Sequence, residues 1–255
     1  MSLFSFFKSK PARISLLHAT RGRPVEPLKC RQLWFDMASK PDRVEHVFAI
    51  DDDDVIGKTA LADYHPHVVK QPGLGCVGAW NLAAEKSTGD ILIQLSDDWL
   101  PVKGWDDIVE QRLGLKKPAV LQISDGHRKD DLLCMAILNR KRMEQVGHFL
   151  PPAYTGIFSD DEFSFRAFDD GVIVDARDVQ FTHDHPNYNP AKEMDETYMN
   201  QNKAEKHREA KAIFIERNPE AKKRWFVKDH WERKFITREA YAEIKKAEKA
   251  AKGKV

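Results

Sequence analysis

The sequence predicts an α/β protein with a mixed, mostly parallel central sheet flanked by helices. Residues 91–95 form an apolar run with one polar residue, which is typical of a strand buried on both faces of a parallel sheet. Residues 28–37 have helical apolar spacing and separate two further strand-like segments, 13–19 and 44–50. Strand–helix–strand order with short connections is typical of a parallel sheet covered by helices.

The remaining elements follow from the same patterns. Segments with the composition of strands lie at 68–70, 119–124, 132–138, 172–175 and 179–182. Segments with helical patterns lie at 79–86, after a glycine-rich turn at 73–78, and at 140–146 and 160–169. From Glu193 onward the pattern is helical and highly charged, with an interruption at Pro219. We therefore expect one domain over 13–190 and a charged helical C-terminal extension over 191–255.

Charge is divided unevenly between these two parts. The 255-residue chain has 41 Lys/Arg and 40 Asp/Glu, of which 17 and 9 lie in residues 201–255, so the tail carries +8 and the remainder −7. An acidic body suits a cation-binding site. A basic tail suits a polyanion, although lysine-rich helical tails are commonly just solvated.

Aromatic residues alternate with basic ones in this tail. They are Trp225, Phe226, Trp231 and Phe235. Such side chains can stack on a nucleic acid, or they can pack the extension onto the body while the charges face water. We favour packing.

Bulk composition excludes several classes of protein. Hydrophobic content of 42% and charged content of 32% indicate a soluble globular protein with a sizeable core. No apolar run approaches the ~20 residues that a membrane-spanning helix needs. Cys30, Cys76 and Cys134 are odd in number and lack metal or redox spacing, so we expect reduced thiols in a cytoplasmic protein.

The strand at 91–95 ends in two adjacent carboxylates, Asp97 and Asp98. This end of a strand is where open α/β sheets bind ligands. Hard oxygen ligands there suit Mg²⁺ or Mn²⁺, and such ions usually bridge a phosphate. The alternative is a solvated loop in which Asp98 caps the next turn.

Two other loops carry weaker signals. Asp51 to Asp54 follow the strand at 44–50, and a ribose, a base edge or a cation would compensate their repulsion; the alternative is a solvated turn. The glycines in 71–78 would let backbone approach an anion at a helix N-terminus, but the spacing matches neither common phosphate-binding motif.

Acidic residues begin the predicted helix at 160–169. The helix dipole stabilises carboxylates there, so Asp160 is either an N-cap or a general base held toward a cleft, with Asp161 beside it.

Two histidines follow the last predicted strand. Alternation places His183 and His185 on one face and Asp184 on the other. Two imidazoles near carboxylates from elsewhere would complete a metal site; alone, such a pair is more often a surface feature.

The order of these motifs over residues 13–186 resembles the family 2 glycosyltransferases, which have the GT-A fold. The motifs are a strand followed by Thr20-Arg-Gly-Arg23, a strand followed by the Asp cluster, a glycine-rich turn followed by Asn81, Gly89-Asp90-strand-Asp97-Asp98-x-x-Pro101, the helix from Asp160 to Arg166, and a late histidine.

The resemblance implies a role for each matching residue. Residues that would bind the nucleotide sugar are Thr20, Arg21, Arg23, Asp51, Asp53, Asn81 and Asp97. Residues that would hold Mn²⁺ or Mg²⁺ are Asp97, Asp98 and His183, with His185 as a substitute. Asp160 would be the catalytic base, with Asp161 as the second catalytic candidate. Two positions depart from the family pattern: Leu95 replaces the first Asp of the metal motif, and Ser159 replaces a Glu before Asp160.

We therefore hypothesise a metal-dependent, inverting transfer of sugar from a nucleoside-diphosphate donor to a hydroxyl acceptor, which would be a glycan, a lipid or a nucleic-acid base. The cation would lie on Asp97 and His183, and Arg21 or Arg23 would help bind the diphosphate. The alternatives are a nucleotidyltransferase, or a catalytically degenerate sugar-nucleotide-binding module whose basic tail binds a polyanion.

Overall fold

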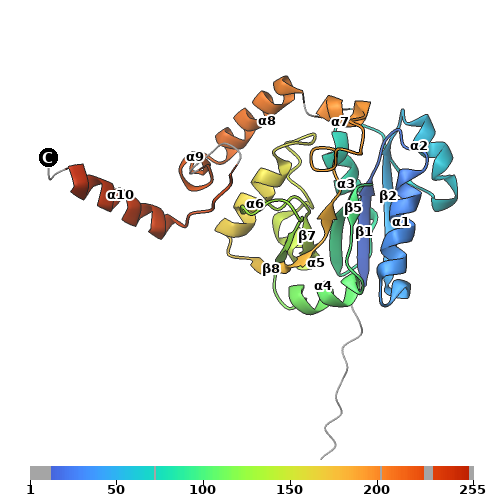
Figure 1. Ribbon diagram of the computed structural model, residues 1–255, viewed down its shortest axis with the longest axis horizontal. Helices are drawn as coiled ribbons and strands as arrows, with labels where there is room; N and C mark the ends of the chain where they lie inside the picture. Colours follow the sequence, from blue (N-terminus) through green and yellow to red (C-terminus); the bar gives the residue numbers. More distant parts are fainter. Residues whose placement is uncertain (1–12, 72, 202, 227–231, 253–255) are drawn as a thin grey trace, which may run out of the picture.

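A computed structural model describes residues 13–71, 73–201, 203–226 and 232–252 (Figure 1). Its central sheet has seven strands in the order β3-β2-β1-β4-β7-β6-β8. All neighbours are parallel except β7, which runs antiparallel to β4 and β6. The predicted mixed, mostly parallel sheet is thus confirmed. The strands are β1 (Ile14–Ala19), β2 (Val44–Asp51), β3 (His67–Val69), β4 (Ile91–Leu95), β6 (Val120–Ser124), β7 (Ile137–Asn139) and β8 (Ile173–Gln180), and β5 (Trp99–Leu100) pairs separately with β9 (Thr182–His183).

Helices cover both faces of the sheet. Helices α1 and α4 pack on one face, and α3, α6, α8 and α9 contribute to the core on the other. The helices are α1 (Glu26–Met37), α2 (Val55–Ala60), α3 (Gly75–Lys86), α4 (Trp105–Leu113), α5 (Arg140–Val146), α6 (Ser159–Asp169), α7 (Glu196–Gln201), α8 (Ala204–Arg217), α9 (Ala221–Arg224) and α10 (Arg238–Lys252). Short 3₁₀ turns lie at Pro41–Arg43 and Ala62–Tyr64.

Strand β4 is apolar because it is buried on both faces. Ile91, Ile93 and Leu95 pack in the core beneath α1 and α4, whereas Leu92 packs in the core beneath α3. Leu95 has no exposed surface. The position at which the resembling family has an Asp is therefore a core position here.

Three predicted boundaries are wrong. Of the predicted strand 132–138, only residues 137 and 138 lie in β7, because the preceding backbone bonds elsewhere: Leu133 N–H donates to Ser164 Oγ, and Ala136 N–H donates to the Gln94 side chain. The predicted strands 172–175 and 179–182 are largely one strand, because β8 runs from 173 to 180 and only residue 182 lies in β9; the register of β8 against β6 is irregular near the end of β6.

The third wrong boundary is the glycine-rich turn, since α3 already begins at Gly75. Gly75 has φ +60°, and a Cβ there would lie 2.0 Å from the carbonyl oxygen of Thr155. Glycine thus lets the start of α3 pack closely against the 155 loop, which explains this glycine without a phosphate.

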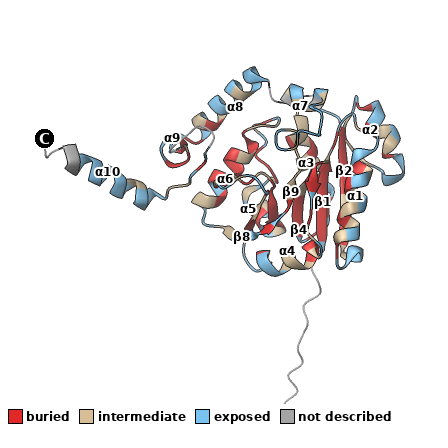
Figure 2. Ribbon diagram, viewed as in Figure 1, coloured by how far each residue is buried: buried red, intermediate tan, exposed pale blue. Residues whose placement is uncertain are grey.

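The first part of the C-terminal extension packs onto the body of the protein, and its last helix projects away (Figure 2). Phe214 and Trp225 have no exposed surface and belong to the same core as α3 and α6, and Phe226 and Phe235 pack against that core. The packing interpretation is confirmed for these side chains, while Trp231 lies outside the described residues. Helix α10 projects away from the body, with mostly exposed side chains (Figure 2). No helix in the described ranges combines the length and apolar character needed to cross a bilayer.

Candidate functional site

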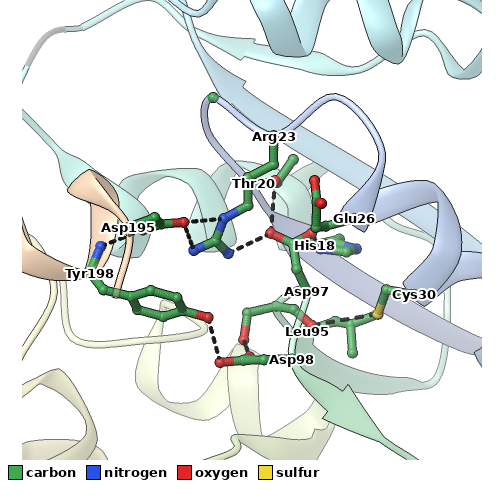
Figure 3. A network of polar contacts seen from close by, with 12 residues as sticks. His18, Thr20, Arg23, Glu26, Cys30, Leu95, Asp97, Asp98, Asp195 and Tyr198 are labelled. Atoms are coloured by element: carbon green, nitrogen blue, oxygen red, sulfur yellow. Dashed lines mark hydrogen bonds and ion pairs between the residues drawn. The ribbon is translucent and has the colours of Figure 1, made fainter. Parts of the chain in front are cut away.

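The carboxyl ends of β1 and β4 meet because the two strands are parallel neighbours, with His18 opposite Leu95. The side chain of Asp97, which follows β4, is 4% exposed and accepts three hydrogen bonds (Figure 3). They come from His18 Nε2 at 2.9 Å, Thr20 Oγ1 at 3.1 Å and Arg23 Nη1 at 2.8 Å. Burial opposes ionisation, but His18 and Arg23 outweigh it and hold the pKa of Asp97 below its ordinary value.

A second histidine, His46, is hydrogen-bonded to His18. His18 Nε2–H donates to Asp97, and the other ring nitrogen of His18, Nδ1, shares a hydrogen bond of 2.9 Å with His46 Nε2. Burial, and then the neighbouring His18, lower the pKa of His46 well below its ordinary value. The Asp97–His18–His46 chain therefore fixes the orientation of Asp97.

Asp98 turns toward a different set of partners. Its Oδ1 accepts from Ser96 Oγ at 2.7 Å, and its Oδ2 accepts from the Tyr198 hydroxyl at 2.9 Å. His183 Nε2 lies 3.2 Å from the same Oδ2, and the His183 ring stacks on Trp99 with centroids 4.2 Å apart. Burial raises the pKa of Asp98, but these partners outweigh it and lower the pKa strongly.

The pairing of His183 differs from our expectation. We expected His183 to share a cation with Asp97, yet the structure places it against Asp98, because the β5–β9 ladder pairs Trp99 with His183. His185 lies beside it, with ring centroids 5.2 Å apart, and its Nδ1 accepts from the Asn187 amide at 3.0 Å.

The oxygen of Asp98 and the nitrogen of His183 fit a divalent cation. Their 3.2 Å separation matches adjacent octahedral ligands with bonds of roughly 2.1–2.3 Å. Within the described ranges no group of three or more His, Cys, Asp or Glu could hold a metal. Substrate oxygens and water would have to fill the other positions, as is usual for Mg²⁺ sites at phosphates.

A segment around α7 covers both carboxylates. Arg23 donates from Nε and Nη2 to Asp195 Oδ2, at 3.0 and 2.7 Å, and its guanidinium lies 4.5 Å from the centroid of the Tyr198 ring. The sequence did not single out Asp195 or Tyr198, because the helical, highly charged pattern from Glu193 onward does not show which of its side chains face the strand ends. Arg23 thus links Asp97 to this segment (Figure 3).

The acidic run after β2 is compensated within the protein. Arg21 donates to Asp51 Oδ2 at 2.7 Å and to both oxygens of Asp53, at 2.5 and 2.8 Å. Asp54 caps α2 by accepting from Gly57 N–H at 2.9 Å. A phosphate that bound Arg21 would compete with the two carboxylates.

Asn81 is occupied by the backbone of another loop. Its side-chain oxygen accepts from the amides of Phe149 and Leu150 at 3.0 and 2.9 Å, and its NH₂ donates to Leu150 O at 2.9 Å. The amide therefore holds this loop onto α3, and its assignment to nucleotide binding stays a prediction.

Asp160 and Asp161 lie in the first turn of α6, where the sequence places them, but their surroundings differ. Asp161 is buried and accepts from Trp225 Nε1 at 2.7 Å and from Arg233 Nε at 2.9 Å. Asp160 Oδ1 accepts from the Asp161 amide at 3.0 Å, and no group in the described part of the chain donates to its Oδ2. Burial, then repulsion by Asp161, raise the pKa of Asp160 to about 6.

The turn that presents Asp160 is strained. Phe158, which precedes α6, has φ +67°, a region that a bulky side chain rarely adopts. Its ring is buried against His207 and Phe214, with centroids 5.0 and 5.9 Å away. Packing thus holds a backbone conformation of the kind that clusters at active sites.

The molecule is thus an α/β protein with a mixed, mostly parallel sheet and carboxylates at the carboxyl ends of β2 and β4. No family model matches the sequence, and no curated protein matches it. Solved structures show the likeness: the mannosyltransferase PcManGT from Pyrobaculum calidifontis, in complex with GDP-Man and Mn²⁺, is 15% identical with TM-score 0.56, over 71% of this chain and 59% of that one.

Staphylococcus aureus TarS has the same fold. The full structure is 13% identical with TM-score 0.54, over 86% of this chain and 44% of that one. TarS 1-349 in complex with UDP-GlcNAc is 12% identical with TM-score 0.52, over 82% and 73%. This chain therefore has the GT-A fold, and spans 59% of the length of the mannosyltransferase.

Proposed function

We propose that this protein is an inverting, metal-dependent glycosyltransferase that moves a sugar from a nucleoside-diphosphate donor to a hydroxyl acceptor. The observation that carries the proposal is the pairing of Asp98 with His183 at the carboxyl edge of the sheet. The chain also has, on Asp160, a carboxylate oxygen to which no described residue donates a hydrogen bond. Structures of the same fold, named as complexes with GDP-Man and Mn²⁺ or with UDP-GlcNAc, support it.

Asp98 and His183 would hold Mn²⁺ or Mg²⁺. A cation bound there would offset the negative charge that builds up on the departing nucleoside diphosphate. Since Asp97 is fixed by His18, Thr20 and Arg23, we assign it to orienting the donor rather than to sharing the cation with His183.

Arginines of the loop after β1 would bind the diphosphate. A guanidinium suits phosphate oxygens, and Arg21 and Arg23 already lie among the carboxylates of the strand ends. On donor binding, phosphate would replace part of their contact with Asp53 and Asp195, while Asp51 would be released toward the ribose or base.

Asp160 would act as the general base. It would take the proton of the acceptor hydroxyl while that oxygen attacks the anomeric carbon, and the bond from that carbon to the diphosphate oxygen would break. A pKa of about 6 leaves the carboxylate mostly ionised at neutral pH and still more basic than an ordinary Asp. The attack comes from the side opposite the leaving group, so the product would be inverted.

Product analysis tests the proposal. The wild-type chain is incubated with UDP- and GDP-sugars, with Mn²⁺ and with EDTA, and a panel of hydroxyl acceptors. Release of free nucleoside diphosphate with sugar on the acceptor supports it. A product that retains nucleoside monophosphate indicates the nucleotidyltransferase, and saturable binding with neither hydrolysis nor transfer indicates the degenerate module.

A further inference from the structure

Part of the C-terminal extension lies against the start of α6. We define residues 232–236 as the C-terminal strap. On one side its amides at Lys234 and Ile236 donate to the carbonyls of Trp225 and Arg224, at 3.0 and 2.9 Å. On the other side the strap bonds to Asp131, whose amide donates to Arg233 O at 2.8 Å. The strap is thus fixed between α9 and the loop before β7.

This position delivers a buried guanidinium to the acidic first turn of α6. The side chain of Arg233 is 7% exposed, with Nε 2.9 Å from Asp161 Oδ1 and Nη2 3.3 Å from Asp161 Oδ2. Asp161 itself is 2% exposed. A buried carboxylate with this bond removed would be an uncompensated charge directly beside Asp160.

The groups that act on Asp160 come from four elements. Asp161 repels it from its own helix, whereas Arg233 from the strap and Arg128 from the loop after β6 attract it. The charge of Asp160 also acts on two thiols: that of Cys134, which lies in the same loop as Arg128, and that of Cys76, which lies in α3.

Of the two cations, Arg128 is already committed to a carboxylate of its own loop. Its Nε donates to Asp130 Oδ1 at 2.9 Å, and Nη2 pairs with the other oxygen. Arg233 is therefore the cation that bonds directly to the Asp160–Asp161 pair, through Asp161, while Arg128 attracts Asp160 from its own ion pair.

We propose that Arg233 is a positioning residue for Asp160: by neutralising Asp161, it lets Asp160 ionise at neutral pH, so that the C-terminal extension completes the acidic end of the active centre. Its catalytic meaning rests on the function proposed above, whereas the electrostatic effect does not.

The same extension provides a matched control. Arg224 is as buried as Arg233, and it also ties the extension to α6, but at the other end of the helix: Nη2 donates to Asp169 Oδ1 at 2.6 Å and Nε donates to Ile236 O at 2.8 Å. Arg224→Met loosens the extension and removes no charge beside Asp160.

The experiment compares Arg233→Met, Arg233→Lys and Arg224→Met with the wild type. The first readout is the ¹³C-carboxyl NMR titration of Asp160, assigned through Asp160→Asn, and the second is the acidic limb of the pH profile of kcat/KM. We expect Arg233→Met to shift both upward by about one pH unit or more. Arg233→Lys restores most of the wild-type value, and Arg224→Met leaves it unchanged. Arg233→Gln, which keeps a donor without the charge, gives the same shift as Arg233→Met and serves if that variant does not fold.

An unshifted titration in the folded Met or Gln variant overturns the proposal, and so does an equal shift in Arg224→Met. If the wild type transfers no sugar but the titration shifts as expected, the proposed function fails while the electrostatic effect of Arg233 stands.

Discussion

Asp160→Asn should slow the reaction and stabilise the protein at the same time. The substitution keeps the shape of the side chain and removes a charge that burial and Asp161 disfavour. We expect kcat to fall by roughly 10²–10⁴-fold, the usual contribution of a general base. The KM for the donor should change little, because Asp97, Asp98 and Arg23 are untouched.

The gain in stability follows from linkage. Folding raises the pKa of Asp160 from 3.8 to about 6, so the native state binds more protons than the unfolded state between those values, and stability falls as pH rises through that window. A pKa difference of about two between the folded and unfolded states corresponds to at most about 3 kcal/mol. Because Asp160 is only partly buried, we expect a gain of roughly 1–2 kcal/mol at pH 7, vanishing below about pH 4.

The assay is urea denaturation at pH 4 and pH 7, together with initial rates of transfer. The control is Asp178→Asn, a surface carboxylate on β8 paired with Arg112. In the wild type, kcat/KM should fall about tenfold per pH unit below 6. Retention of the rate within threefold in Asp160→Asn would refute the base, and destabilisation at pH 7 would refute the electrostatics.

Three further predictions concern other parts of the molecule. Without added metal, Asp98→Asn should destabilise the protein by about 1–2 kcal/mol at pH 7, because three groups contact this buried carboxylate. Folding lowers the pKa of Asp98, so this destabilisation should shrink as the pH falls below the ordinary pKa of Asp. Denaturation at pH 7 and at pH 3 checks both statements. His183→Ala should abolish the Mn²⁺-dependent part of nucleotide binding measured by calorimetry, whereas His148→Ala, on the loop between α5 and α6, should leave it intact; equal losses in both would count against the metal site. Gly75→Ala should lower the free energy of unfolding by about 2 kcal/mol or more, since the new Cβ would meet the Thr155 carbonyl. Gly73 also has a positive φ but has open space around it, so Gly73→Ala should lower the free energy of unfolding by only about 1 kcal/mol. Equal urea midpoints for the two variants would show that the close approach at Gly75 does not affect stability.

Strands and helices with a strong period were predictable from the sequence. The run at 91–95 had to be buried on both faces, and Asp97 and Asp98 had to follow it at the ligand-binding end of the sheet. The irregular course of residues 132–136 was not predictable, because a side chain of β4 and a hydroxyl of α6 take the backbone bonds that a strand would use.

The partners within the site were less predictable than its location. His183 contacts Asp98 and not Asp97 because of the β5–β9 register, which the local sequence does not determine. Tyr198 and Arg233 reach the site from 100 and 72 residues away in sequence from Asp98 and Asp161, and only the packing of the extension places them there. A buried arginine in a lysine-rich tail leaves no signal in composition.

The most direct test of the account is anomalous diffraction from crystals grown with Mn²⁺ and the nucleoside diphosphate that stabilises the protein most. We predict a manganese peak bonded to Asp98 Oδ2 and His183 Nε2, with diphosphate oxygens on its open side. A diphosphate seated at the strand ends with no manganese between it and these two side chains would contradict the central claim.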